Sequence, residues 1–304
     1  MTNVLVTGGA GFIGSNLVDM LLEKGFNVSV LDNFSSGKKE NVPPRINLIK
    51  GDICDKDIVK KALKDVQVVY HFAAQASVSV SMKEPLLDAN VNTIGTLNLL
   101  NQAFTSEIDQ FIFSSTGGAI YGEPAKIPPS ETSPEEPVSI YGVSKLAAEK
   151  YIKFYEKVGL NCSILRFANV YGPRQDPNGE AGVISIFLNN IKSNKPVYVF
   201  GDGTSSRDYV YVKDVARTAI EILKKPSPDP INIGSGKETI MNDLILSIEN
   251  IVGKNIEVIY TDERKGDVKN IYLDCTRLKK HLNWIPSTSL ENGLTEVWKW
   301  INTV

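Results

Sequence analysis

The stretch VLVTGGAGFIGSNLVDMLL, residues 4–22, decides the fold that we expect for this chain. It joins an apolar, strand-like run to an amphipathic helical pattern and places Gly8, Gly11 and Gly14 across the junction. Glycines at this spacing let the backbone approach a diphosphate, whose negative charge then faces the positive end of the helix. The stretch therefore predicts a strand, a phosphate-binding turn and a helix, which together open a Rossmann-type fold.

A second β-rich run, FNVSVLD, ends at Asp32, near the offset at which an acidic side chain meets the adenosine ribose in such folds. Its carboxylate would accept hydrogen bonds from the ribose hydroxyls and would repel a 2′-phosphate. We therefore expect NAD, and not NADP, as the cofactor. The ends of the third and fourth strand-like runs would supply adenine and pyrophosphate contacts, although plain turns would give the same pattern; these residues are Asp52, Ile53, Phe72, Ala73, Ala74 and Gln75.

Strand-like and helical patterns alternate through the first half of the chain. The runs VQVVYHFAA (66–74), IDQFIFSS (108–115) and NCSILRFANVYG (161–172) are almost continuously apolar, as in a parallel sheet covered by helices on both faces. We predict an α/β fold, a Rossmann-type doubly wound parallel sheet with a smaller mixed α/β C-terminal substrate lobe. The cofactor domain is expected over 1–172 with 208–236 returning to it, and the substrate lobe over 173–207 and 237–304.

Composition favours a small-molecule partner. The 304 residues carry a net charge of −2, so no basic surface points to nucleic acid, and no long apolar stretch points to a membrane. The cysteines Cys54, Cys162 and Cys275 lie far apart and the chain has two histidines, so we expect no metal site. Because Met1 leads directly into an apolar strand, we expect no signal peptide and a soluble cytoplasmic protein.

A candidate acid–base pair lies in PVSIYGVSKLAAEKYIKFYEKVG, residues 137–159, which has the pattern of a helix that starts near Ser139 and ends near Gly159. Tyr141 and Lys145 are four residues apart and share one face of that helix. A free tyrosine has a pKa of about 10 and is a poor base near neutrality. A nearby ammonium and the positive nicotinamide ring would favour the phenolate, so we expect the pKa of Tyr141 to be lowered.

Six motifs together resemble the extended short-chain dehydrogenase/reductase family, and within it the nucleotide-sugar epimerases of the UDP-glucose 4-epimerase type. The resemblance covers nearly the whole chain in family order. Its motifs are TGGAGFIGS (7–15), Asp32 with Asn33, YGVSK (141–145), RFANVYGPRQ (166–175), RDYVYVKDV (207–215) and LNWIPSTSLENGL (282–294).

The resemblance implies a tightly held NAD, a UDP-sugar substrate and a triad of hydroxyl, tyrosine and lysine. Tyr141 would take the proton of the sugar 4-hydroxyl, Lys145 would hold the nicotinamide ribose, and Thr116 would hydrogen-bond the reacting hydroxyl. Contacts to the sugar, the diphosphate and the uridine ribose are implied for Asn169, Arg207, Arg264 and Asp267. The further residues expected at the cofactor are Phe12, Ile13, Asn33, Ser35, Gly37, Asn90 and Ser114.

The loop expected at SSTGGAIYG, residues 114–122, separates the reactions open to this family. Relatives that eliminate water or lose carbon dioxide carry an acidic residue after the catalytic hydroxyl, whereas Gly117 and Gly118 follow Thr116 here. Glycine has no side chain to move a proton, but it offers room and flexibility for a keto sugar to turn over. Epimerisation at C4 is therefore expected, with Ser115 as the alternative catalytic hydroxyl.

The sequence leaves the choice of sugar open. Ile271 matches a position at which some relatives carry a bulky tyrosine and others a small residue that admits N-acetylated sugars, so both UDP-glucose/UDP-galactose and the N-acetylhexosamine pair are expected substrates. The alternatives are a UDP-glucuronate 4-epimerase, a 4,6-dehydratase or decarboxylase, and a catalytically silent binding protein. A homodimer that pairs the helix of Tyr141 with its neighbour near 88–104 is also expected from the resemblance.

Overall fold

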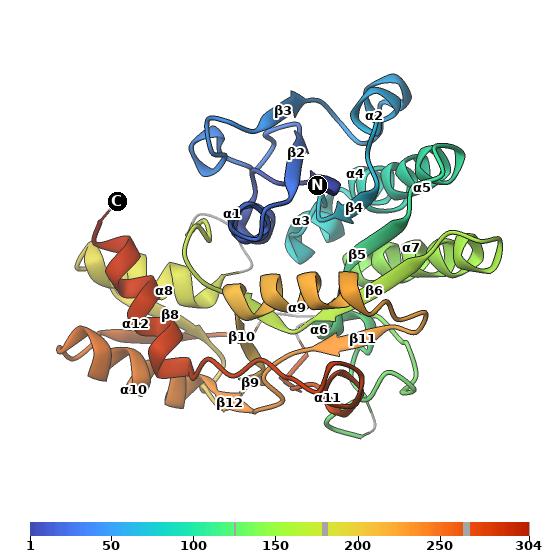
Figure 1. Ribbon diagram of the computed structural model, residues 1–304. Coiled ribbons are helices and arrows are strands. Elements are labelled where there is room, and N and C mark those ends of the chain that lie inside the picture. The colour runs from blue at the N-terminus through green and yellow to red at the C-terminus, as the bar shows by residue number, and fades with distance from the viewer. Residues whose placement is uncertain (125, 178–181, 264–267, 304) are drawn as a thin grey trace.

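A seven-stranded sheet forms the centre of the computed structural model, which describes residues 1–124, 126–177, 182–263 and 268–303. The strand order is β11-β6-β5-β4-β1-β2-β3, and every neighbouring pair is parallel, which confirms the predicted doubly wound fold (Figure 1). The strands are β1 (Asn3–Thr7), β2 (Asn27–Asp32), β3 (Asn47–Lys50), β4 (Val68–His71), β5 (Gln110–Thr116), β6 (Cys162–Phe167) and β11 (Ile231–Ile233).

Helices cover both faces of the sheet because its strands are apolar on both sides. Val4 and Val6 of β1 belong to the core beneath α1 (Phe12–Glu23) and α9 (Val212–Lys224), whereas Leu5 faces the opposite way. The opposite core is covered by α2 (Lys56–Ala62), α5 (Thr96–Thr105) and α7 (Ile140–Lys157).

Short helical segments lead into the longer helices. The chain forms α3 (Val78–Lys83), α4 (Pro85–Ala89) and a π-helical segment (Asn90–Gly95) before α5. A 3-10 turn covers Lys39–Asn41, and the four-residue α6 (Gly117–Ile120) follows β5. Residues 85–105 are therefore helical without a break, but the hydrogen-bond spacing of the helix changes at residues 90–95, next to α7.

The substrate side has a core of its own, made by three helices and a two-stranded sheet at the lower left of Figure 1. These are α8 (Val183–Lys192), α10 (Met241–Val252), α12 (Leu290–Ile301), β8 (Val197–Phe200) and β13 (Val258–Thr261). A three-stranded sheet lies beside it, with β12 (Thr239–Ile240), β9 (Ser206–Arg207) and β14 (Asn270–Ile271). The remaining helix is α11 (Thr276–Leu282), which packs on the α1 side of the large sheet.

The chain passes between the two parts more than once. The single strand expected over 161–172 is in fact two strands, because Ala168 N donates to Ile233 O in the large sheet while Asn169 N donates to Asp208 O. From Asn169 onward the chain forms β7 (Asn169–Tyr171), which pairs with β10 (Tyr209–Tyr211). Helix α9 and strand β11 then return to the large sheet. This change of partner places β7 and β10 at the carboxyl edge of the sheet.

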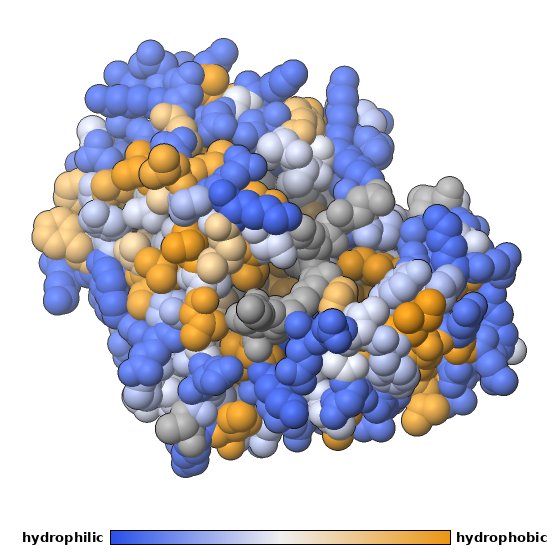
Figure 2. All heavy atoms as spheres, turned by 180° about the vertical axis from the view of Figure 1, so that it is seen from behind, coloured by the Kyte–Doolittle hydropathy of each residue, from blue (hydrophilic) through white to orange (hydrophobic). Residues whose placement is uncertain are grey.

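No helix in the described part of the chain is both long and apolar enough to cross a membrane. Figure 2 shows the face behind that of Figure 1, where hydrophilic residues dominate the rim and hydrophobic residues lie nearer the centre, around a hollow.

Candidate active site

The glycine-rich turn is packed too closely for any side chain. Gly8 has a φ of +68°, and a Cβ there would lie 2.6 Å from Ala73 N at the end of β4. A Cβ on Gly14 would lie 2.2 Å from Gly8 O, so glycine alone lets α1 approach the strand. Helix α1 starts after Gly11 with no side-chain cap and no acidic residue in its first turn. Its first N–H groups can therefore bind a diphosphate.

Asp32 ends β2 beside this turn and is buried. Its Oδ2 accepts a hydrogen bond from Ala10 N at 2.9 Å and its Oδ1 accepts one from Phe34 N at 2.8 Å. Gly37 returns so close that a Cβ would lie 2.8 Å from Oδ1. Each carboxylate oxygen has a second lone pair, so the clamped side chain can still accept hydrogen bonds from a ribose.

Two further expected residues lie at the next strand end. Asp52 Oδ2 accepts a hydrogen bond from Asn33 Nδ2 at 2.8 Å, and Ser35 N donates to Asn33 Oδ1 at 2.9 Å. Ile53 behaves differently, because its side chain is buried in the core under α5 and its carbonyl accepts from Asn98 Nδ2 at 2.7 Å. Only the Asp52 side of this pair faces outward.

The remaining residues expected at the cofactor lie on both sides of these strand ends. Phe12 packs against the core of the substrate side and Ile13 against the cores of both parts, while Phe72, Ala73, Ala74 and Gln75 directly follow β4. Asn90 is exposed, and its carbonyl accepts a hydrogen bond from Cys54 Sγ. The hydroxyl of Ser114 donates to His71 O at 3.1 Å, between β5 and β4.

Tyr141 and Lys145 lie in the first two turns of α7, next to the end of β5. The helix starts as expected at Ser139, whose Oγ accepts from Gly142 N at 3.2 Å. Lys145 Nζ donates to Ser114 O at 2.9 Å, and the Tyr141 hydroxyl is hydrogen-bonded to the Thr116 side chain. The structure thus brings together the three residues of the expected triad.

Burial shifts the pKa values of both residues of this pair. Burial raises the pKa of Tyr141 above its usual value and the charge of Asp88 adds to this, while the Thr116 hydrogen bond opposes it. Burial lowers the pKa of Lys145 to about 8, against the charges of Asp88 and Glu149. Burial dominates the pKa of Tyr141 and the Lys145 ammonium faces Ser114 O, so the protein's own groups do not lower this pKa overall; the expected lowering, which also relies on the positive nicotinamide ring, stays a prediction.

The neighbouring hydroxyls of Ser115 and Thr116 in β5 bind different residues of α7. Ser115 Oγ donates to Glu149 Oε1 at 2.5 Å, and both side chains are buried. The same carboxylate binds Arg166, through Nε at 3.0 Å and Nη2 at 2.6 Å. Ser115 therefore belongs to a buried ionic network, while the Thr116 hydroxyl lies at Tyr141.

The two glycines after Thr116 have different surroundings. A loop was expected at these residues, but the two glycines begin helix α6. A Cβ on Gly117 would lie 2.5 Å from Leu273 Cδ1, so packing excludes a side chain there. A Cβ on Gly118 would have only Asn169 Oδ1 at 3.6 Å and Thr116 Oγ1 at 3.9 Å near it. The space beside the triad is thus at Gly118.

On the substrate side, the structure describes two of the four residues implied by resemblance. Asn169 starts β7 and faces Gly118, and Arg207 lies in β9, where its Nη1 donates to Ser206 O at 2.8 Å and Lys269 O at 3.0 Å. Ile271 is paired with Arg207 in register and is buried. The other two, Arg264 and Asp267, lie outside the described residues.

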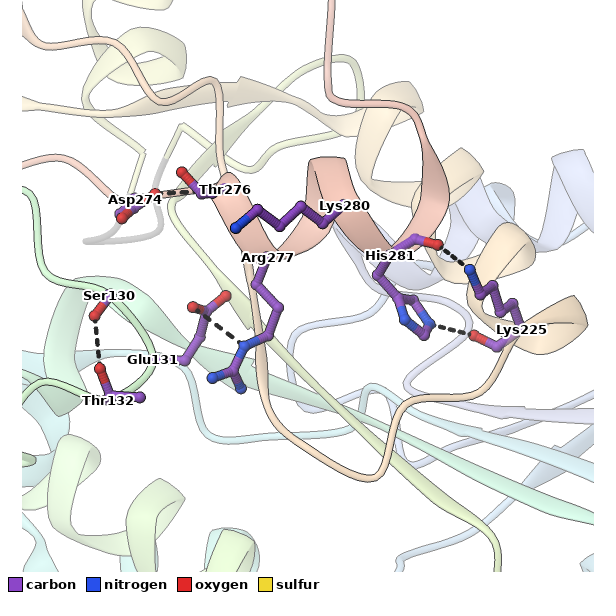
Figure 3. A pocket seen from close by; sticks show the side chains of 9 residues that line it. All are labelled: Ser130, Glu131, Thr132, Lys225, Asp274, Thr276, Arg277, Lys280 and His281. Atoms are coloured by element: carbon purple, nitrogen blue, oxygen red, sulfur yellow. Dashed lines mark hydrogen bonds and ion pairs between the residues drawn. The ribbon is translucent and has the colours of Figure 1, made fainter.

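A groove of about 510 Å³ lies elsewhere, and none of the expected site residues lines it (Figure 3). In it, Arg277 reaches from α11 toward Glu131, at 3.6 Å. Lys225 Nζ donates to His281 O at 2.6 Å, and His281 Nε2 lies 2.8 Å from Lys225 O. The side chains of Glu131, Arg277 and Lys225 thus have partners within the protein, and we assign the groove a structural role.

Sequence reasoning missed the carboxylates behind the triad. Asp88 and Glu149 are buried carboxylates whose charges act on Lys145, and Arg166 is the buried cation that binds Glu149. Glu149 follows Lys145 by four residues and so shares its helix face, a spacing that could have signalled it. Asp88 had no such signal, because it is 53 residues from Tyr141 in the chain (141 minus 88).

Comparison with known proteins gives consistent matches over the whole length. The family model described as "NAD dependent epimerase/dehydratase family" matches residues 4–234. A UDP-glucose 4-epimerase from Thermotoga maritima, solved with UDP-glucose, is 45% identical with a TM-score of 0.97, each chain being covered to 99%. One from Thermus thermophilus, solved with NAD, is 40% identical with a TM-score of 0.94, again with 99% of each chain covered.

A third solved structure carries another substrate name. It is the UDP-N-acetylglucosamine 4-epimerase of Methanobrevibacter ruminantium in complex with UDP-N-acetylmuramic acid, 38% identical with a TM-score of 0.95. The match covers 99% of this chain and 98% of that one. Relatives of similar fold and identity thus differ in the sugar in their names.

Proposed function

The chain belongs to the NAD dependent epimerase/dehydratase family, and from that premise we propose that it interconverts the C4 epimers of a UDP-hexose through a transient 4-keto sugar. UDP-glucose and UDP-galactose are the proposed main pair. The observation that carries this proposal is the cluster of Thr116, Tyr141 and Lys145 beside the open space at Gly118.

NAD is the cofactor of the family, and the nucleotide end of this chain fits it. The turn at Gly8, Gly11 and Gly14 leaves the first N–H groups of α1 available for a diphosphate, and Asp32 would bind the ribose; no basic side chain among the described residues is bonded to it. When bound, NAD supplies the hydride acceptor and donor, and in its oxidised form a positive ring.

The protein's own residues handle the proton and the geometry. Tyr141 takes the proton from the sugar 4-hydroxyl and later returns one, while Thr116 hydrogen-bonds the same oxygen. With a pKa of about 8, Lys145 is mostly charged at neutral pH, and its ammonium favours the phenolate when it turns toward Tyr141 and the ribose. Burial and the charge of Asp88 raise the pKa of Tyr141, and the positive nicotinamide ring would favour its phenolate.

The space at Gly118 supports epimerisation over elimination. An acidic residue there would project between Thr116 and Asn169, but glycine leaves this volume empty and has no proton to give. Return of hydride to the opposite face requires the keto sugar to turn, and a turning ring needs space. The dehydratase and decarboxylase alternatives would need a carboxylate after Thr116, and this chain has Gly117 and Gly118 there.

The substrate contacts are proposed at Asn169, Arg207, Arg264 and Asp267. Guanidinium groups suit a diphosphate because they can donate two parallel hydrogen bonds. Buried Ile271 beside Arg207 is smaller than tyrosine, and the N-acetylhexosamine relative supports the proposal that such sugars are also accepted. A UDP-glucuronate substrate is the second candidate, since a uronate needs only one added polar contact.

The test is turnover without added NAD. The protein is incubated with UDP-glucose, UDP-galactose, UDP-glucuronate and the N-acetylated pair, and the sugars are separated by chromatography. We expect equilibration of the glucose and galactose forms. Tyr141→Phe should lose turnover but keep bound NAD, whereas Tyr198→Phe, on an exposed strand, should change neither. A 4-keto-6-deoxy sugar or a pentose as the product would overturn the proposal.

We also propose a homodimer, a cytoplasmic location and the division into a cofactor part (1–172 with 208–236) and a substrate part. Ile94, Tyr151 and Phe154 are exposed apolar side chains on the helical rows around α5 and α7, which supports pairing of these helices between two copies. All three cysteines are free, as is usual in reducing compartments. Light scattering should give a particle mass of twice the chain mass of 33.4 kDa, and Phe154→Glu should lower the measured mass to that of one chain.

A further inference from the structure

Asp88 is a fully buried carboxylate, at 0% exposure, that no step of the proposed reaction uses. Its Oδ2 accepts hydrogen bonds from Gln75 Nε2 at 2.8 Å and from Asn92 Nδ2 at 2.9 Å. Its Oδ1 is buried and has no hydrogen-bond partner. A buried anionic oxygen without a partner costs free energy, so its retention calls for an explanation.

The segment around Asp88 is attached to the catalytic helix at Tyr141 and at Ser144. Tyr141 N donates to Ser81 Oγ in α3 at 3.0 Å, and Thr93 Oγ1 donates to Ser144 O at 3.3 Å. Asp88 lies on α4, between these two attachments in the chain. The arrangement holds the carboxylate close enough to Tyr141 and Lys145 for its charge to act on both.

Lys145 needs a counter-charge because its ammonium is buried, with 2% of the residue exposed, and Ser114 O is a neutral acceptor. Two carboxylates act on it, Asp88 and Glu149. Both oxygens of Glu149 are bound to Arg166, which neutralises its charge. No salt bridge among the described residues neutralises Asp88, so its charge can act on Lys145.

We propose that Asp88 is a positioning residue of the active site, the buried counter-charge that keeps the Lys145 ammonium charged and ties it to the cofactor side of the sheet. The connection to the cofactor side runs through Gln75, which follows β4 and whose side chain donates to Asp88. Gln75 also binds Asn92: the backbone N of Gln75 donates to Asn92 Oδ1 at 3.0 Å, and the backbone O of Gln75 accepts from Asn92 Nδ2 at 2.8 Å. The role in turnover rests on the proposed function of Tyr141 and Lys145, whereas the electrostatic role does not.

The other ionisable groups around Asp88 do not replace it. On α7 these are Tyr141, Lys145 and Glu149, the last paired as described. On β4, His71 is uncharged because burial, and then the charge of Lys145, lower its pKa to about 3. On the turn between α3 and α4, Lys83 and Glu84 are exposed to solvent, where their charges are screened.

Loss of the Asp88 charge has a characteristic effect on pH dependence. The charge raises the pKa of Tyr141 and that of Lys145, so its removal lowers both. In the NAD-loaded protein, where the positive ring favours the Tyr141 phenolate, the rising limb of the pH–rate profile follows deprotonation of Tyr141 and the falling limb follows deprotonation of Lys145, so both limbs move to lower pH. A purely structural role would reduce the rate without moving both limbs in one direction.

The decisive experiment is an NMR titration of Lys145 in protein labelled with carbon-13 at lysine Cε, with the signal assigned by Lys145→Arg and with equal NAD content in all samples. In Asp88→Asn, which keeps an oxygen for Gln75 and Asn92, we expect the pKa of Lys145 to fall by about one unit. Glu84→Gln, an exposed carboxylate near the start of α4, is the matched control and should leave this pKa unchanged.

The outcomes separate this proposal from the proposed function. An unchanged Lys145 pKa in folded Asp88→Asn overturns the counter-charge role, whatever the enzyme turns over. A lowered pKa together with no UDP-hexose turnover in the wild type supports the counter-charge and rejects the proposed reaction. Should Asp88→Asn fail to fold, Asp88→Ser makes the same measurement, and Asp88→Glu, which keeps the charge, should retain the wild-type pKa.

Discussion

The buried network behind the triad yields the largest predicted loss of stability in this protein. Arg166 is fully buried, at 0% exposure, and donates to Glu149 through Nε and Nη2, to Tyr121 Oη through Nη1 at 3.0 Å, and to Glu135 through Nη2. Glu149→Ala removes two of these bonds and also the acceptor of Ser115 Oγ. Breaking a buried ion pair from one side costs about 3–5 kcal/mol, because the remaining charge stays buried.

We expect Glu149→Ala to lie near the lower end of that range, at about 3 kcal/mol, because Glu135 still pairs with Arg166. Urea unfolding followed by circular dichroism measures the loss. Glu135→Ala is the matched control, and because this side chain is 23% exposed its loss should be about 1 kcal/mol. Equal losses for the two variants would refute the reasoning, since they would show that burial of the Glu149 pair does not set its energy.

A second comparison tests whether charge or packing is lost. Glu149→Leu combined with Arg166→Met removes both charges and keeps similar volumes. Because neither charge is then left buried alone, this double variant should recover most of the stability that Glu149→Ala loses. A double variant as unstable as the single one would mean that the neutral hydrogen bonds to Ser115 and Tyr121 carry the energy.

Three further predictions concern the active site. Gly117→Ala should lose about 1–3 kcal/mol of unfolding free energy in urea, because the added methyl meets the buried side chain of Leu273. Gly118→Ala should keep its stability within about 1 kcal/mol but lower kcat, because its methyl lies in the space proposed for the sugar. Equal effects of the two variants on stability would contradict this packing difference. Gly14→Ala should lose bound NAD, read from absorbance after denaturation, because its Cβ would lie 2.2 Å from a carbonyl oxygen of the turn; full NAD content would argue against the tight-turn explanation. Turnover should fall as pH rises above about 8, the pKa of Lys145, because the ammonium is lost, and Lys145→Arg should abolish that decline even if its rate is low; an unchanged decline would assign it to another group.

Local spacing allowed a large part of the site to be predicted. The glycines at 8, 11 and 14 and the acidic residue at 32 follow strands whose apolar runs are visible in the sequence, and Tyr141 and Lys145 are one helical turn apart. Such features depend on residues within one or two neighbouring elements. For the same reason the doubly wound fold itself could be predicted.

Features made by contacts between distant segments could not be predicted. The direction of Ser115 depends on Glu149, 34 residues further along the chain, and the carboxylate of Asp88 reaches the catalytic pair only because α3 and the π-helical segment are attached to α7. The rise that burial causes in the pKa of Tyr141 was not predicted either. Desolvation depends on everything packed around a group, and no spacing in the sequence reports it.

The sequence by itself therefore determined the cofactor turn, the order of strands and helices, and the residue types available for proton transfer, because these follow from backbone geometry and periodicity over short distances. Only the tertiary structure decided which hydroxyl of β5 lies at Tyr141, that the open space is at Gly118 and not at Gly117, and which buried charges surround Lys145. Those properties arise when segments far apart in the chain exclude water from one another, and their energies exist only in the packed state.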